Sequence, residues 1–282
     1  MRAAPDRERI AEWALVLASA GIAHRVERVA DGWCLLVAAR DEQPAALVLD
    51  AYDAERPAGR VPEPPEHGTT AAGLVSAGLL VAFYLVTGPR DAASVWFRRG
   101  SAAADLIARG EVWRTVTALT LHADAGHVVG NALGCALFVT AVCRSLGPGL
   151  GSWLVLLSGA AGNAITALAV HGAGRSAVGA STAIFGAVGI LGSLAFARRR
   201  RRGARNPRAW LALAASLALL GMLGTSEGAD LPSHLFGLLA GGAAGTVTAL
   251  AIGRPPGAAI QSALALAGLA LVGGCWLLAL KG

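Results

Sequence analysis

Residues 179–202 read GASTAIFGAVGILGSLAFARRRRR, and this stretch decides the fold because it joins an uncharged run to a cluster of arginines. The run from Ser181 to Ala197 has no charged side chain and approaches the ~20 residues that a helix needs to cross the hydrocarbon core of a bilayer. The five arginines that follow mark the cytoplasmic end of such a helix, because positively charged residues accumulate on that side of a membrane. We therefore expect a transmembrane helix with Ser181 at its outer end.

The rest of the chain has the composition of a membrane protein. Of its 282 residues, 55% are hydrophobic and only 15% are charged, whereas soluble domains contain about 25% charged residues. Twelve of the 18 acidic residues precede residue 70, so the sequence beyond that point consists of long apolar tracts with short polar breaks. Such tracts indicate that a lipid bilayer is the solvent of this part of the chain.

Seven apolar stretches after residue 69 approach the length of a membrane span. Several are rich in glycine and alanine, which allow membrane helices to pack closely. They predict an all-α polytopic membrane protein, with a six-helix bundle and a seventh, C-terminal helix. The stretches are 70–88, 127–146, 148–171, 176–197, 208–225, 231–252 and 257–280.

The first 60 residues predict a small cytosolic α+β module, for which a regulatory tether and a passive extension are both compatible roles. Four prolines between residues 57 and 65 predict a linker, placed at 61–69, before a transmembrane domain over 70–282. The expected elements of the module are a helix over 7–19, strands over 22–29 and 33–38, and a helix from an N-cap at Asp41 to about Glu55.

Charge and cysteine patterns exclude several classes of protein. Seven arginines lie between residues 198 and 208, but they fall between two apolar stretches and lack a recognition pattern, so no nucleic-acid partner is expected. The four cysteines show neither a CxxC pair nor a metal spacing. The polar first residues resemble no signal peptide. This predicts a multi-pass protein of the cell membrane with a cytoplasmic N-terminus, and we expect a bacterial plasma membrane.

The segment over residues 89–126 is predicted to lie on the outer side of the membrane. Trp96, Phe97 and Trp113 are typical of an interfacial segment in the headgroup layer. Trp113 and Arg114 are interpreted as residues that order this loop, and His122 as a residue that packs within it.

Four polar residues in the apolar stretches are functional candidates, because polar groups in a membrane are costly. They are His127, Asn131, Ser181 and His234. His127 and Ser181 each precede an inner-side arginine by 17 residues, and His234 precedes Arg254 by 20. At 1.5 Å per helical residue, these groups lie roughly 25–30 Å above the inner edge. Three helices therefore place their rare polar groups in one layer near the outer surface.

These residue types fit nucleophilic catalysis. Serine needs an adjacent base to act as a nucleophile, and His234 is the one histidine in a late span. No acidic residue lies within the spans, which predicts a Ser181–His234 dyad. The backbone N–H of Ser181 and the side chains of Asn131 and His127 are candidate donors of an oxyanion hole.

Four supporting residues surround this dyad. Phe185, four residues after Ser181, is expected to stack on the His234 ring. Gly179 allows the backbone to approach a reacting carbonyl closely. Gly237 and Gly241 form a small-xxx-small face that predicts close packing between the helices of Ser181 and His234.

Two other classes fit less well. His122, Asp124, His127 and His234 contain no HExxH run of an intramembrane metalloprotease, so no metal is expected. A transporter predicts internal repeats or ionisable groups near the middle of the membrane, and the sequence shows neither.

The sequence resembles the rhomboid family of intramembrane serine proteases over about residues 70–252. Four segments match in the order of the family. They are Glu111-Val112-Trp113-Arg114 with Thr117, His122-(x4)-His127-(x3)-Asn131, Gly179-Ala180-Ser181 with Gly186, and His234-x-x-Gly237-x-x-x-Gly241.

The resemblance implies that Ser181 is the nucleophile, that His234 is the base, and that Asn131 and His127 line the oxyanion hole. It also implies cleavage of transmembrane substrates near the outer membrane face without a metal or cofactor. Thr182 stands where many members have glycine, and Phe185 where tyrosine is frequent. The alternative is a catalytically silent rhomboid-like protein that binds membrane clients, although such relatives typically lack the serine or the histidine.

Overall fold

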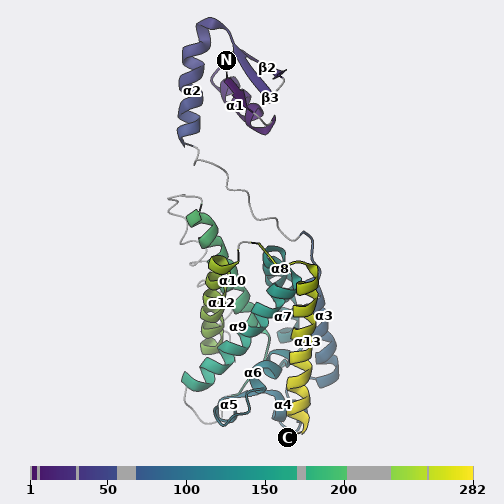
Figure 1. The fold of residues 1–282 in the computed structure, drawn as a ribbon. Coiled ribbons are helices and arrows are strands. Elements are labelled where there is room, and N and C mark those ends of the chain that lie inside the picture. Colours follow the sequence, from purple (N-terminus) through teal and green to yellow (C-terminus); the bar gives the residue numbers. More distant parts are fainter. Residues whose placement is uncertain are drawn as a thin grey trace. The chain divides into compact units, whose positions relative to one another are not determined.

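The computed structural model describes residues 2–4, 7–29, 32–55, 68–169, 176–201, 230–252 and 254–281. The chain divides into two compact units, the first over Met1–Pro62 and the second over most of the remaining chain (Figure 1). The linker predicted at 61–69 and the apolar stretch at 208–225 lie largely or wholly outside the described residues.

The N-terminal unit is an α+β module. Its three-stranded antiparallel sheet has the order β1-β3-β2, and a core formed by Ile10, Leu17, Leu35 and Leu49 joins the sheet to two helices. The first helix has the predicted bounds, and the second runs from the residue after Asp41 to Glu55, as expected, with a 3-10 turn before it. The three-residue strand β1 is too short to show an alternating pattern. The elements are β1 (Arg2–Ala4), α1 (Arg7–Ser19), β2 (His24–Val29), β3 (Gly32–Val37), η1 (Ala39–Asp41) and α2 (Glu42–Glu55).

The second unit is a multi-pass membrane domain built of helices, with one pair of two-residue strands. Among the described residues, five helices are long and apolar enough to cross a membrane, and the apolar helix α3 (Ala72–Thr87) is shorter, at 16 residues. The predicted seventh span is among the five. They are α7–η3–α8 (Ala125–Leu146), which contains a π-helical segment at Cys135–Val139, α9 (Pro148–Ala169), α10 (Ser181–Arg201), α12 (Leu231–Ala251) and α13 (Ala258–Lys281).

The span predicted at 176–197 begins later than expected. Residues 176 and 177 form strand β5, which pairs antiparallel with β4 (Ala102–Ala103) in the preceding loop, and helix α10 starts at Ser181. Strand pairing removes these residues from the helix because their backbone groups bond to β4 instead. The serine therefore lies at the junction between an extended segment and a helix.

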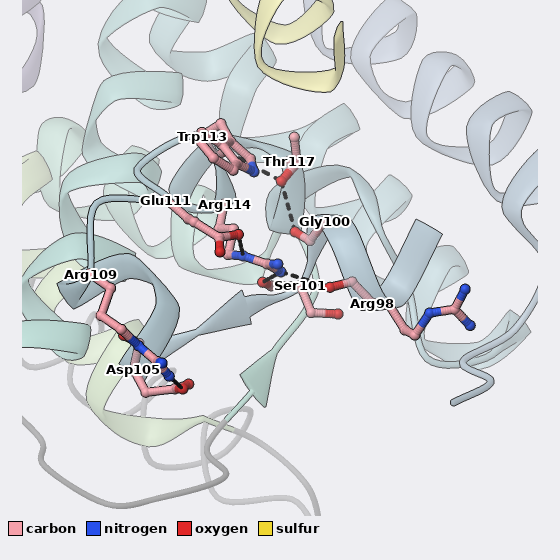
Figure 2. A network of polar contacts seen from close by, with 9 residues as sticks. All are labelled: Arg98, Gly100, Ser101, Asp105, Arg109, Glu111, Trp113, Arg114 and Thr117. Atoms are coloured by element: carbon pink, nitrogen blue, oxygen red, sulfur yellow. Dashed lines mark hydrogen bonds and ion pairs between the residues drawn. The ribbon is translucent and has the colours of Figure 1, made fainter. Parts of the chain in front are cut away.

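Residues 88–124, called here the 88–124 loop, form a folded cap of short elements. Arg114 is buried and donates hydrogen bonds to Glu111 Oε2 at 2.8 Å and to the carbonyls of Arg98 and Ser101, both at 3.0 Å (Figure 2). A charge-assisted bond is stronger than a neutral one, so this side chain orders the loop, as predicted. The elements are α4 (Val95–Gly100), β4 (Ala102–Ala103), α5 (Ala104–Ala108), α6 (Arg114–Thr117) and η2 (Ala118–Thr120).

Helices α10 and α12 pack with their backbones in contact. A Cβ atom added at Gly237 would lie 2.3 Å from the Thr182 carbonyl oxygen, and one added at Gly241 would lie 2.0 Å from the Gly186 carbonyl oxygen. Real Cβ atoms do not approach backbone this closely, so only glycine fits at both positions. Gly237 and Gly241, the two residues of the predicted small-xxx-small face, thus both lie against the backbone of α10.

Substituting Gly241 by alanine should separate α10 from α12, because backbone atoms cannot yield to the added methyl group. We expect Gly241→Ala to destabilise the domain by about 1–3 kcal/mol. Gly242→Ala is the matched control, because a Cβ at Gly242 meets only Ser193 Oγ at 3.7 Å. Thermal unfolding in detergent measures both, and equal midpoints for the two variants would contradict this packing.

Candidate active site

Ser181 is held by the segment that precedes it. Gly179 has φ +121°, a conformation that side-chain-bearing residues rarely adopt. Its N–H donates a hydrogen bond of 2.9 Å to the Ala118 carbonyl in η2. Together with the β4–β5 pairing, this bond fixes the backbone two residues before the serine to the 88–124 loop.

Ser181 and His234 meet across the α10–α12 interface. Ser181 Oγ lies 2.7 Å from His234 Nε2, a hydrogen-bond distance, although 53 residues separate them in the chain. His234 is buried in the first turn of α12 and Ser181 is half-buried. The Phe185 ring lies 4.7 Å from the imidazole centroid at an interplanar angle of 31°, so it covers one face of the base, where stacking was expected.

The second nitrogen of His234 makes no hydrogen bond to an acidic side chain among the residues that the structure describes. Within the described residues, Nδ1 is buried and makes no hydrogen bond. The nearby carboxylate of Asp230 accepts a hydrogen bond from Ser233 Oγ at 2.7 Å.

Asn131 and His127 converge on the same point from α7. A Cβ added at Gly179 would lie 2.6 Å from His127 Nε2 and 3.3 Å from Asn131 Nδ2. Both donors therefore face the backbone next to Ser181, and a glycine there leaves room for them. Asn131 is buried, and its Nδ2 has no partner among the described residues. An unpaired buried donor is expensive, which points to an acceptor that arrives with a ligand.

The orientation of His127 is set by its own turn. The Ala123 N–H lies 3.3 Å from His127 Nδ1, and Asp124 caps the helix by accepting from the His127 N–H at 2.8 Å. Since Nδ1 accepts a hydrogen bond, the neutral ring carries its proton on Nε2, the atom that faces Gly179.

His122 packs beneath His127, as predicted. It is fully buried, and the two rings are edge-to-face with centroids 5.2 Å apart. Burial lowers the pKa of His122 from 6.5 to about 4, so its ring is neutral at physiological pH. Among the described residues, no group of three His, Cys, Asp or Glu side chains could hold a metal.

Two contributions to the site have no sequence signature. One is the Ala118 carbonyl, because any residue type offers this group. The other is the fit of Thr182, whose Cγ2 lies 2.6 Å from a Cβ built at Gly162 and 3.0 Å from one built at Gly237. Glycines on α9 and α12 thus make space for a side chain where many rhomboids have none.

Two comparisons relate this chain to known proteins. A family model described as the rhomboid domain matches residues 109–251, which is 143 of 282 residues and includes all four candidate site residues. The protein named "Putative rhomboid protease YdcA" of Bacillus subtilis (strain 168) is 31% identical over 140 residues. That alignment covers 48% of this chain and 66% of the relative, slightly less than two thirds of its length.

The pKa of His122 predicts a pH dependence of stability. The unfolded chain has a histidine pKa near ~6.5 and binds more protons than the folded chain between that value and the folded pKa of about 4. The contribution of neutral, buried His122 to the free energy of unfolding is therefore complete above pH ~6.5 and is lost as the pH falls towards ~4. We expect the thermal midpoint to fall less for His122→Phe than for wild type between about pH 7 and about pH 5. Equal shifts would show that His122 does not titrate in this way.

Proposed function

The chain belongs to the rhomboid family, and on that premise we propose that it is an intramembrane serine protease with Ser181 as nucleophile and His234 as general base. The observation that carries the proposal is the 2.7 Å contact between Ser181 Oγ and His234 Nε2. A nucleophile within hydrogen-bond reach of its base is the geometric signature of covalent catalysis.

The first step is attack on a peptide carbonyl. His234 Nε2 accepts the serine proton as the Oγ–C bond forms, so Nδ1 carries the proton of the neutral ring. The tetrahedral intermediate collapses to an acyl-enzyme when His234 returns that proton to the leaving amine. Water then repeats the sequence and releases the acyl group. Phe185 holds the imidazole plane throughout by covering one face.

The oxyanion of each intermediate is stabilised by donors beside Ser181. Asn131 Nδ2, which is buried and unpaired among the described residues, and His127 Nε2 both face the Gly179 backbone. The Ser181 N–H is a third donor, because the first N–H groups of a helix lack partners within it. Fixed donors in a site of low dielectric require no reorganisation as the charge develops.

The substrates of this reaction are transmembrane proteins. Ser181 begins α10, whose opposite end carries the arginines that mark the cytoplasmic side, so the serine lies near the outer face. A substrate helix that unwinds there exposes the backbone carbonyl that Ser181 attacks. Every group named in this mechanism is a side chain or backbone group of the chain, so no metal or cofactor is required.

Purified protein should cleave a single-span test substrate in liposomes, and chelators should not inhibit it. We expect Ser181→Ala and His234→Ala each to lower kcat by at least about 10³-fold, since members of a catalytic unit fail together. Ser193→Ala is the matched control. It removes another α10 hydroxyl that bonds to α12, through the Gly242 carbonyl at 2.7 Å, and it should leave the rate nearly unchanged.

Two outcomes would contradict the proposal. Cleavage that persists in Ser181→Ala would exclude this serine as nucleophile. Failure of the wild-type protein to cleave any member of a substrate panel would favour the client-binding alternative.

Asn131→Ala tests the oxyanion hole separately. We expect kcat to fall by about 10²–10³-fold with little loss of stability, because the amide nitrogen that is lost has no partner among the described residues. Asn163→Ala is the control, since Asn163 Nδ2 already bonds to the Thr115 carbonyl at 2.9 Å and its loss should lower the thermal midpoint instead. Wild-type kcat in Asn131→Ala would remove Asn131 from the mechanism.

A further inference from the structure

The C-terminal helix α13 lies outside the matched rhomboid domain, which ends at residue 251, yet it is fastened to that domain at both ends. At its N-terminal end, Gln261 is buried and bonds to the turn between α8 and α9. Its Oε1 accepts from the Gly149 and Leu150 N–H groups at 2.8 and 2.9 Å, and its Nε2 donates to the Leu146 carbonyl at 2.9 Å. These three hydrogen bonds from one buried polar side chain attach α13 to the bundle more specifically than apolar packing alone would.

At the other end of α13, Trp276 enters an aromatic cluster with the 88–124 loop. Its ring centroid lies 5.3 Å from that of Phe83 on α3 and 5.2 Å from that of Trp96 on α4. Leu121 and Phe97 are buried in the same cluster. Trp96 is half-buried and Phe97 is buried in this cluster against the C-terminal helix, and their expected position in the headgroup layer stays a prediction.

A chain of hydrogen bonds leads from Trp276 towards the nucleophile. Trp276 Nε1 donates to Thr120 Oγ1 at 3.1 Å, and that hydroxyl donates to the Thr117 carbonyl at 2.7 Å. Both residues bracket Ala118, whose carbonyl accepts the Gly179 N–H at 2.9 Å. One indole therefore fixes the short helix η2 that holds the backbone two residues before Ser181.

The same turn leads to the oxyanion side of the site. Leu121, which is fully buried against the Trp276 cluster, is followed by His122, which packs against His127. A shift of η2 would move the Gly179 backbone and the His127 ring together. Misplacement by about 1 Å is enough to slow an enzyme by orders of magnitude.

We propose that α13 helps to hold the catalytic residues in place. Trp276 is its positioning residue for Ser181 and acts through Thr120 and the Ala118 carbonyl. The inference rests on the proposed protease function. Trp276 touches no reacting atom. It sets the geometry of the turn that orients the nucleophile segment, so its loss slows the chemical step without weakening substrate binding.

The test is the kinetics of test-substrate cleavage by the full chain in liposomes. We expect Trp276→Phe and Thr120→Val each to lower kcat by about two- to tenfold with KM unchanged, the rate equivalent of one hydrogen bond. The double variant should be no slower than the slower single variant, because both changes break the same bond. Thr120→Val is close to isosteric and keeps the test decisive if Trp276→Phe folds poorly.

Trp153→Phe is the matched control. Trp153 on α9 also contacts α13, lying 3.4 Å from a Cβ built at Gly268, but far along the helix from the Thr120 turn. The kcat of Trp153→Phe should stay within about twofold of wild type, a smaller change than the loss of one hydrogen bond would cause. Unchanged kcat in Trp276→Phe and Thr120→Val, or an equal loss in Trp153→Phe, would overturn the proposal. Absence of Ser181-dependent cleavage in the wild type would instead overturn the protease function itself, and with it the role of Trp276.

Discussion

The contact between the backbones of α10 and α12 is the constraint on which the rest of the structure depends. Ser181 and His234 are 53 residues apart, and their 2.7 Å approach requires two helices that touch without intervening side chains. In lipid there is no hydrophobic force to press helices together, so packing must come from close van der Waals contact. Gly237 and Gly241 permit that contact by lying against the carbonyls of Thr182 and Gly186.

The backbone that precedes Ser181 is positioned by the 88–124 loop. Buried Arg114 stabilises the loop through hydrogen bonds to backbone carbonyls within it. The Ala118 carbonyl of the same loop accepts the hydrogen bond from the Gly179 N–H. The loop thus connects the nucleophile segment to the His127 turn. Helix α13 also supports this loop, through the hydrogen bond that Trp276 Nε1 donates to Thr120 Oγ1. The proposed catalytic geometry therefore depends on one interhelical contact and one folded loop.

Much of this organisation was predictable from sequence because it depends on side-chain type and helical spacing. Hydrophobic length located the helices, and counting residues to the arginines placed His127, Ser181 and His234 in one layer. Backbone-mediated features were not predictable. Any residue can supply the Ala118 carbonyl, and the two-residue strand β5 is too short to interrupt an apolar pattern. The packing of Trp96 and Phe97 against α13 was not predicted, because an aromatic belt and an aromatic cluster use the same residue types.

Covalent labelling is the most direct test of the Ser181–His234 dyad. A fluorophosphonate reacts with an activated serine by forming an Oγ–P bond with loss of fluoride, and mass spectrometry of the digested protein locates the adduct. Labelling of Ser181 in the wild type, and its loss in His234→Ala, is the expected result, because the hydroxyl needs its base to become nucleophilic. An adduct on another residue, or none on Ser181 in protein that cleaves substrate, would contradict the dyad.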